Sequence, residues 1–330
     1  MRRVRAALFI LGAALLLAVL IRIGPAAAAS MFARLSWYLP LIIVFPHAVI
    51  VILEALGWRF AFRRSRVAFR ALISAGLAGE AFNVTTPTAS LGGEAVKAWL
   101  IRPYVPLTES LPAVIIAKTT VTIGQALYLL LGLVVAMTVL PLESPLLQAM
   151  QWFLVLEVFG IGGFIAIQTL GVLGTGGRML RQLGLLARAD GAHALGRVDG
   201  ALVHFYRKEP WRLALSIGCH FLGWAVGALE VYLIMWALGV HVSLGTAVVI
   251  DTIASGISFA MFLVPARLGV LEAGEVAVFL ALGLGAPVGL TVALTQRLRE
   301  AAWTGIGFLA VMSLRAKAPE AAGAPLEAEH

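Results

Sequence analysis

The chain has 330 residues, of which 61% belong to the apolar set AVILMFWYC and only 13% are charged. A soluble domain carries roughly 25% charged residues, so this composition excludes a water-soluble globular protein and predicts a surface that faces lipid. The net charge is +8, but the basic residues gather in stretches that flank long apolar runs. Basic residues in such positions orient a protein in the membrane. We therefore attribute the positive charge to membrane topology and expect no nucleic-acid partner.

The first apolar run, residues 7–23, follows Arg2, Arg3 and Arg5 and precedes the alanine-rich segment Ala26–Ser30. Its length suits a membrane anchor, and we expect it to be retained. A cleaved signal peptide is the alternative.

A helix needs about 20 residues to cross the hydrocarbon core, which predicts six full spans at 7–23, 36–57, 111–140, 149–172, 212–238 and 287–314. Two more apolar stretches, 71–103 and 244–284, are broken by Gly, Pro, Ser, Thr and acidic residues. If the basic stretches are cytoplasmic, the first broken stretch begins and ends inside and the second begins and ends outside. We therefore expect an all-α polytopic protein of the cytoplasmic (inner) membrane, with both termini cytoplasmic and two re-entrant helical hairpins.

The two broken stretches resemble each other. Pro87 precedes Leu-Gly-Gly-Glu94-Ala, Pro265 precedes Leu-Gly269 and Glu272-Ala, and a cation follows each motif at a similar distance, Lys118 and Arg297. With opposite entry sides, this match predicts an inverted repeat, in which many transporters form a midplane site. We predict one integral membrane domain, 1–315, followed by a disordered tail, 316–330. The domain contains two repeat-like halves, 36–172 and 212–314, joined by an amphipathic cytoplasmic linker, 175–211.

Ionisable residues at membrane depth are costly and are commonly functional. Glu94 and Lys97 share a helical face, which fits either a local ion pair or a half-helix start whose N–H groups, at Gly92 and Gly93, contact a polar headgroup with Thr85 and Thr86. Lys118 either snorkels to the interface or neutralises Glu94 or a lipid phosphate.

In the second stretch, Glu272 and Glu275 share a helical face after Pro265, Arg267 and Gly269. Catalysis or metal binding is disfavoured because no His or nucleophile is near, so we expect pairing with Arg297 or Arg299; a purely structural network that includes Glu300 is the alternative. We interpret four other polar residues, His47, Glu54, Glu157 and Asp251, as structural or interfacial. Aromatic residues near span ends are expected to be interfacial anchors, namely Trp37, Tyr38, Trp58, Trp152 and Trp211.

The sequence contains no phosphate-binding loop, no HExxH, no GxSxG and no CxxC pair, and Cys219 is its one cysteine. ATP hydrolysis and familiar hydrolase chemistry are therefore unsupported. We expect no cofactor, no metal site, no catalytic residue and no enzymatic activity.

The stretch from Glu80 to Glu94, with Pro265–Gly274 and Arg297–Glu300, resembles the flippase-like family named for the transmembrane region of lysylphosphatidylglycerol synthase. The resemblance covers nearly the whole chain and is closest to the hopanoid-biosynthesis-associated branch. It implies movement of a polar lipid between leaflets, with Asn83, Pro87, Gly92, Gly93, Glu94, Pro265, Gly269, Glu272, Arg297 and Glu300 at the site. Arg267 stands where the family more often has Gly, and only 16 residues follow Leu314, so we do not expect transfer of lysine to lipid.

Together these patterns predict translocation of a polar or anionic lipid through a hydrated groove, without ATP hydrolysis. The partners would be membrane lipids, an anionic phospholipid or a hopanoid. The rival hypotheses are an intramembrane lipid-modifying enzyme and a scaffold of a hopanoid-synthesis complex. The lipid, its direction, the energy coupling and the oligomeric state, a homodimer included, stay open. The predicted site residues are Asn83, Thr85, Thr86, Pro87, Gly92, Gly93, Glu94, Lys97, Lys118, Pro265, Arg267, Gly269, Glu272, Glu275, Arg297, Arg299 and Glu300.

Overall fold

The computed structural model describes residues 33–35, 37–63, 67–86, 92–169, 189–260 and 269–321, with Ser65 and isolated positions before residue 33. Within these ranges all regular secondary structure is helical. The elements are α3 (Tyr38–Ala61), α4 (Phe69–Thr85), α5 (Gly92–Leu100), α6 (Leu107–Val139), α7 (Pro145–Thr169), α9 (Ala189–Lys208), α10 (Pro210–Ala237), α11 (Leu244–Ala260), α12 (Val270–Ala281) and α13 (Ala286–Ala321).

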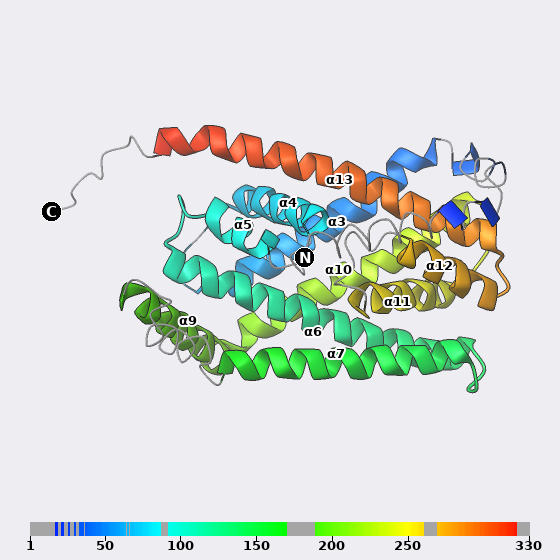
Figure 1. Ribbon diagram of the computed structural model, residues 1–330, viewed down its shortest axis with the longest axis horizontal. Helices are drawn as coiled ribbons and strands as arrows, with labels where there is room; N and C mark the ends of the chain where they lie inside the picture. The colour runs from blue at the N-terminus through cyan, green and yellow to red at the C-terminus, as the bar shows by residue number, and fades with distance from the viewer. Residues whose placement is uncertain are drawn as a thin grey trace.

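The long helices run side by side along the long axis of an elongated bundle (Figure 1). Among the described helices, α3, α6, α7 and α10 are long and apolar enough to cross a membrane. Large apolar side chains cover the outside of the bundle; on α7, for example, Phe159 is 76% exposed. Such a surface is suited to lipid rather than to water.

These helices match four predicted spans, with ends that differ by a few residues. The predicted span 287–314 corresponds to α13, which continues to Ala321, so residues 316–321 are helical and not part of a disordered tail. The predicted span 7–23 and residues 175–188 of the predicted linker lie outside the parts of the chain described above. The rest of the linker contains α9, which buries Val198, Leu202 and Phe205.

Proline and glycine fix several helix ends. The chain breaks at Pro141 after α6, and α7 and α10 begin at Pro145 and Pro210, where a missing N–H costs nothing. Before α12, Gly269 adopts a φ of 77°, a conformation that glycine reaches without strain. The Glu272 side chain accepts a hydrogen bond from the Gly269 N–H, which caps the start of α12.

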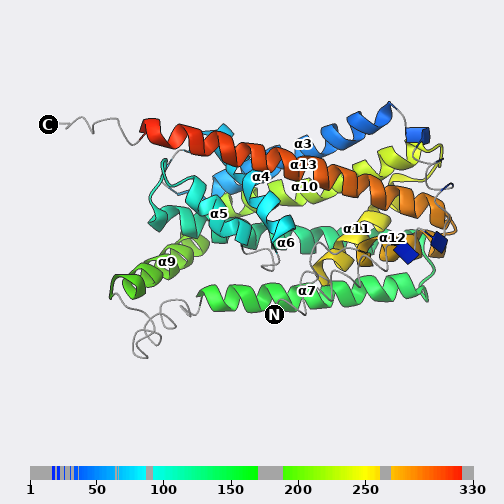
Figure 2. The same cartoon turned by 45° about the horizontal axis from the view of Figure 1, so that its top comes forward.

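Two pairs of short helices lie at opposite ends of the bundle (Figures 1 and 2). The pair α4 and α5 occupies one end, and the pair α11 and α12 occupies the other. Their lengths are 17 and 9 residues for the first pair, and 17 and 12 for the second. At about 1.5 Å per residue, α5 and α12 are too short to cross a hydrocarbon core about 30 Å thick.

The buried apolar residues form two main cores, one toward each end, and the segments between them carry ionisable and hydroxyl side chains among apolar ones. On α3, one core ends at Ile42 and the other begins at Ala55, and His47 and Glu54 lie between them. The same change occurs on three other helices, at Lys118 to Gln125 of α6, Ser216 to Glu230 of α10 and Arg297 to Glu300 of α13. A polar layer therefore crosses the middle of the bundle.

One predicted anchor belongs to a core instead of an interface. Trp58 is 4% exposed and packs among residues of α3, α4 and α6, so its prediction as an interfacial anchor was wrong. Trp37, Trp152 and Trp211 are more than half exposed near helix ends, as anchors require.

Candidate functional site

The α4–α5 pair is joined by a small hydrogen-bonded cluster near the start of α5. The Asn83 Oδ1 atom on α4 accepts a hydrogen bond of 2.8 Å from the Gly93 N–H, one of the donors that a helix start leaves without an intrahelical partner. The Asn83 amide nitrogen donates to Glu94 Oε1 at 3.5 Å. Asn83 therefore fixes both the first turn of α5 and the carboxylate that this turn carries.

Two lysines contact the same carboxylate. Lys97 Nζ lies 3.2 Å from Glu94 Oε1, and Lys118 Nζ, on α6, lies 3.8 Å from it. The predicted ion pair between Glu94 and Lys97 is present, and Lys118 neutralises Glu94 rather than only reaching toward an interface. Glu94 thus holds two cations from two helices.

The α11–α12 pair carries a comparable cluster. Glu272 Oε2 accepts from the Gly269 N–H at 2.7 Å, and Glu272 Oε1 accepts from Arg297 Nε of α13 at 2.5 Å. Arg297 Nη1 donates to Glu300 Oε2 at 2.6 Å. Glu272 has no exposed surface, so Arg297 supplies the charge that its burial requires.

The two clusters share one plan. In each, a short helix begins beside a glycine, carries a glutamate in its first turn, and pairs that glutamate with a cation on the long helix that follows. Glu94 meets Lys118 of α6, and Glu272 meets Arg297 of α13. This similarity in contacts agrees with the similarity of the two sequence motifs.

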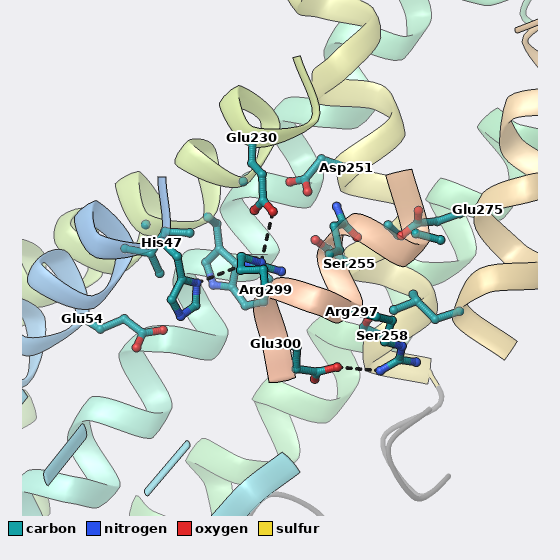
Figure 3. Close-up of a pocket in the computed structure, with 18 of the residues that line it drawn as sticks. His47, Glu54, Glu230, Asp251, Ser255, Ser258, Glu275, Arg297, Arg299 and Glu300 are labelled. Carbon is teal, nitrogen blue, oxygen red and sulfur yellow. Dashed lines mark hydrogen bonds and ion pairs between the residues drawn. The ribbon is translucent and has the colours of Figure 1, made fainter. Parts of the chain in front are cut away.

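A second arginine of α13 reaches α10 and α3. Arg299 Nε lies 3.1 Å from Glu230 Oε1, and Arg299 Nη1 lies 3.1 Å from His47 Nδ1 (Figure 3). The His47 ring in turn lies 4.7 Å from the Trp303 ring. Arg299 therefore links three helices in the polar layer.

Two cavities occupy the polar layer. The larger has a volume of about 220 Å³ and is lined by residues of α3, α6, α10, α11, α12 and α13, among them Asp251, Glu275, Arg297 and Arg299 (Figure 3). The smaller has a volume of about 140 Å³ and lies toward the α4–α5 pair, with Glu80, Glu94, Lys97 and Lys118 in its wall. Four residues line both cavities, namely His47, Glu54, Val121 and His220, so the two spaces adjoin.

Comparison with known proteins identifies the family. Residues 5–306 match the family described as the lysylphosphatidylglycerol synthase TM region. The chain belongs to this family. No curated protein and no solved structure matches the chain. Membership of a membrane-region family, with the apolar helices α3, α6, α7 and α10, makes this a multi-pass membrane protein.

Most of the predicted site residues in this lysylphosphatidylglycerol synthase TM family member fall into the two clusters, but some do not. Thr85 Oγ1 donates to the Ala81 carbonyl and Thr86 Oγ1 to the Phe82 carbonyl, so both hydroxyls serve the last turn of α4. Glu275 lines the larger cavity without pairing with an arginine by hydrogen bond. The predicted positions Pro87, Pro265 and Arg267 lie outside the described residues.

The cavities also contain ionisable residues outside the predicted set of site residues. His47, Glu54 and Asp251 line the larger cavity, and so do His220 and Glu230. Each is an ionisable side chain within an apolar helix, which is the signal that could have placed them at the site. Their joint position could not be read from the sequence because they come from three helices.

Proposed function

We propose that this protein moves a polar membrane lipid between the two leaflets through a hydrated groove, without hydrolysing ATP or altering the lipid. The observation that carries the proposal is the polar layer between two apolar cores, with two adjoining cavities inside it. Figure 3 shows the larger of these cavities. Each ionisable group at membrane depth costs about 2.5 to 3.5 kcal/mol even on the most lenient scale. A passage for charged headgroups is a function that accounts for so many of them.

Water in this layer is supported by the exposure of its acids. Glu54 and Glu80 lie at the wall of the smaller cavity, and both are exposed. Carboxylates at such depth stay charged only where water or a counter-ion reaches them. The cavities therefore suit a hydrated headgroup whose acyl chains remain in the surrounding bilayer.

The short helix pairs support a route from both faces. We infer that α4–α5 and α11–α12 are re-entrant hairpins of an inverted repeat, entering from opposite leaflets and ending at the polar layer. The α4–α5 end carries basic residues in its connections, such as Arg63 and Arg102, and at the start of α10, Arg212. Residues 141–144 and 238–243 contain no Lys or Arg. By the positive-inside rule, we assign the α4–α5 end to the cytoplasmic side of the inner membrane.

The paired charges suggest how a headgroup passes without being trapped. Lys97, Lys118 and Arg297 attract a phosphate, while Glu94 and Glu272 already occupy these cations. A passing phosphate competes with the carboxylates, so that binding is favourable enough for entry and weak enough for exit, as conduction requires. An anionic phospholipid fits this chemistry, and a hopanoid with a polar headgroup is the second lipid to test.

A fluorescent-lipid exchange assay in proteoliposomes tests the proposal. The wild-type protein should speed leaflet exchange of a headgroup-bearing lipid such as phosphatidylglycerol. Glu94→Gln and Arg297→Ala should each slow lipid exchange about tenfold, equivalent to about 1.4 kcal/mol. Each variant removes one member of the carboxylate–cation pairs with which the lipid phosphate would compete. Glu143→Gln, at an exposed acid between α6 and α7, is the matched control and should exchange lipid normally.

Two results would contradict the proposal. Unchanged exchange in both Glu94→Gln and Arg297→Ala would separate transport from these clusters. A new lipid species in the vesicles after incubation, detected by mass spectrometry, would instead favour a lipid-modifying enzyme.

A further inference from the structure

Glu275 is a buried carboxylate without a partner. It lies on α12 with 2% of its surface exposed, and neither carboxylate oxygen has a hydrogen-bond partner among the described residues. It also lines the larger cavity, where Figure 3 shows it at the wall near Asp251 and Ser255. An ionised carboxylate in this position is strongly unfavourable, because burial removes its hydration and nothing replaces it.

The groups that face Glu275 do not supply the missing charge. Arg297 of α13 interacts electrostatically with it, but this guanidinium already contacts Glu272 and Glu300 at 2.5 and 2.6 Å. Arg299, also of α13, contacts Glu230 of α10 and the His47 ring of α3.

On α11, Asp251 Oδ2 accepts a hydrogen bond of 2.8 Å from the Tyr128 hydroxyl. Among the described residues, five carboxylates and two guanidiniums line the larger cavity, namely Glu54, Glu230, Asp251, Glu275 and Glu300 with Arg297 and Arg299. Arg297 is also paired with Glu272. Glu275 is a buried member of this set with neither a hydrogen bond nor an ion pair among the described residues.

A proton is better suited than a metal ion to neutralise the Glu275 carboxylate. Within the described ranges, no group of three or more His, Cys, Asp or Glu side chains could hold a metal ion. A proton needs only one carboxylate oxygen, and Glu275 lies at the wall of the larger cavity with both of its carboxylate oxygens buried. The serines at the same wall, Ser255 and Ser258, offer hydroxyls to water that would carry the proton.

We propose that Glu275 is a proton-binding site that couples lipid movement to a proton gradient, so that an anionic headgroup and a proton cross together. This inference rests on the proposed function. In the step, a proton leaves cavity water and forms an O–H bond at Glu275; after the headgroup has passed, that bond breaks and the proton returns to water. Glu54 lines both cavities and lies where protonated water would pass from one to the other.

The coupling follows from competition for Arg297. An ionised Glu275 and a headgroup phosphate would both attract this guanidinium, so a bound phosphate favours the protonated form of Glu275. By linkage, protonation of Glu275 favours binding of the phosphate to the same extent.

The test uses proteoliposomes with fluorescent phosphatidylglycerol and an imposed pH gradient. Wild-type exchange should run about tenfold faster in the direction of proton flow than against it. Glu275→Gln keeps the size of the side chain and resembles the protonated acid, so exchange should persist but lose its dependence on the gradient. Glu157→Gln is the matched control, because Glu157 is equally buried and unpartnered on α7 but lines neither cavity; it should respond as wild type does.

A second measurement is independent of transport. Infrared difference spectra of the protein in lipid nanodiscs should show a carboxylic acid C=O band that changes when phosphatidylglycerol is added. The change should vanish in Glu275→Gln and persist in Glu157→Gln.

The outcomes separate the two proposals. Wild-type exchange that ignores the gradient would overturn the proton site and leave lipid translocation standing. Failure of the wild-type protein to exchange lipid would overturn the proposed function, and the lipid-dependent band would then show whether Glu275 binds a proton. A lipid-dependent band that survives in Glu275→Gln would overturn its assignment to this residue.

Discussion

At the scale of single residues, the pair of Glu272 and Arg297 is expected to be a large contributor to stability. Glu272 is fully enclosed and Arg297 Nε is its cationic partner at 2.5 Å. Removing one member of a buried pair leaves an uncompensated charge and costs about 3 to 5 kcal/mol. We therefore expect Arg297→Met to lower the free energy of unfolding by about that amount, measured by chemical unfolding in detergent micelles.

A double-mutant cycle checks the origin of this loss. Adding Glu272→Gln to Arg297→Met removes the stranded carboxylate while keeping an oxygen for the Gly269 N–H, so the double variant should recover part of the stability. Arg102→Met is the control, since Arg102 is exposed and stacks on Trp99, an interaction worth about 0.5 to 1 kcal/mol. Equal losses for Arg297→Met and Arg102→Met would mean that the Glu272 pair is not buried as described.

The contacts within one segment of the site were more predictable from the sequence than the contacts between separate helices. The spacing of Glu94 and Lys97 fitted a local ion pair as one of two interpretations, and that ion pair is present. Glu272 and Glu275 were expected to pair with Arg297 or Arg299 because an unpaired acid at that depth is costly, and Glu272 pairs with Arg297. The contact of Arg299 with Glu230 was not expected, because it depends on how α13 packs against α10. Side chains from separate helices come together only when the helices pack. The pattern of residues within one helix does not show which other helix it packs against.

At the scale of elements, the α4–α5 pair depends on two glycines where its helices meet. A Cβ atom added at Gly93 would lie 2.0 Å from the Gly79 carbonyl oxygen and 2.5 Å from Asn83 Oδ1. Since backbone cannot move aside cheaply, Gly93→Ala must push α5 away from α4. Overpacking of this kind costs about 1 to 3 kcal/mol, and separation of the helices should also break the Asn83 hydrogen bond to α5.

The expected result for Gly93→Ala is a lower unfolding midpoint together with slower lipid exchange. Gly162→Ala is the matched control, because a Cβ at Gly162 of α7 meets nothing within 4 Å. Alanine favours a helix over glycine by about 0.5 to 1 kcal/mol, so this variant should be as stable as wild type or slightly more stable. Wild-type stability in Gly93→Ala would refute the close contact between α4 and α5.

Helix existence was more predictable than helix ends. Long apolar runs located α3, α6, α7 and α10, the described helices that are long and apolar enough to cross a membrane. The predicted span 287–314 also coincides with a helix, α13, which is not among these four. The ends moved by several residues, for example from residue 57 to Ala61 in α3, because hydropathy does not record where a hydrogen-bonded turn stops. Trp58 falls within this extension, which explains why an expected interfacial anchor is buried in a core.

At the scale of the whole molecule, the separate clusters form one connected feature. The α4–α5 pair brings Glu94 and Lys97 to the polar layer from one end, and the α11–α12 pair brings Glu272 and Glu275 from the other (Figures 1 and 2). His47 and Glu54 of α3 lie at the wall that both cavities share. The two clusters are therefore connected through the wall that the cavities share.

This arrangement predicts which connections share a side of the membrane. If α4–α5 is a hairpin, the residues before and after it lie on one side, and those flanking α11–α12 lie on the other. In a Cys219→Ala background, Arg63→Cys and Arg102→Cys should therefore react with a membrane-impermeant maleimide only after the cells are opened. His241→Cys and Ala281→Cys, exposed at the opposite end, should react in intact spheroplasts. Labelling of Arg63→Cys and Arg102→Cys from opposite sides would mean that α4–α5 crosses the bilayer, and the headgroup route proposed above would lose its cytoplasmic entrance.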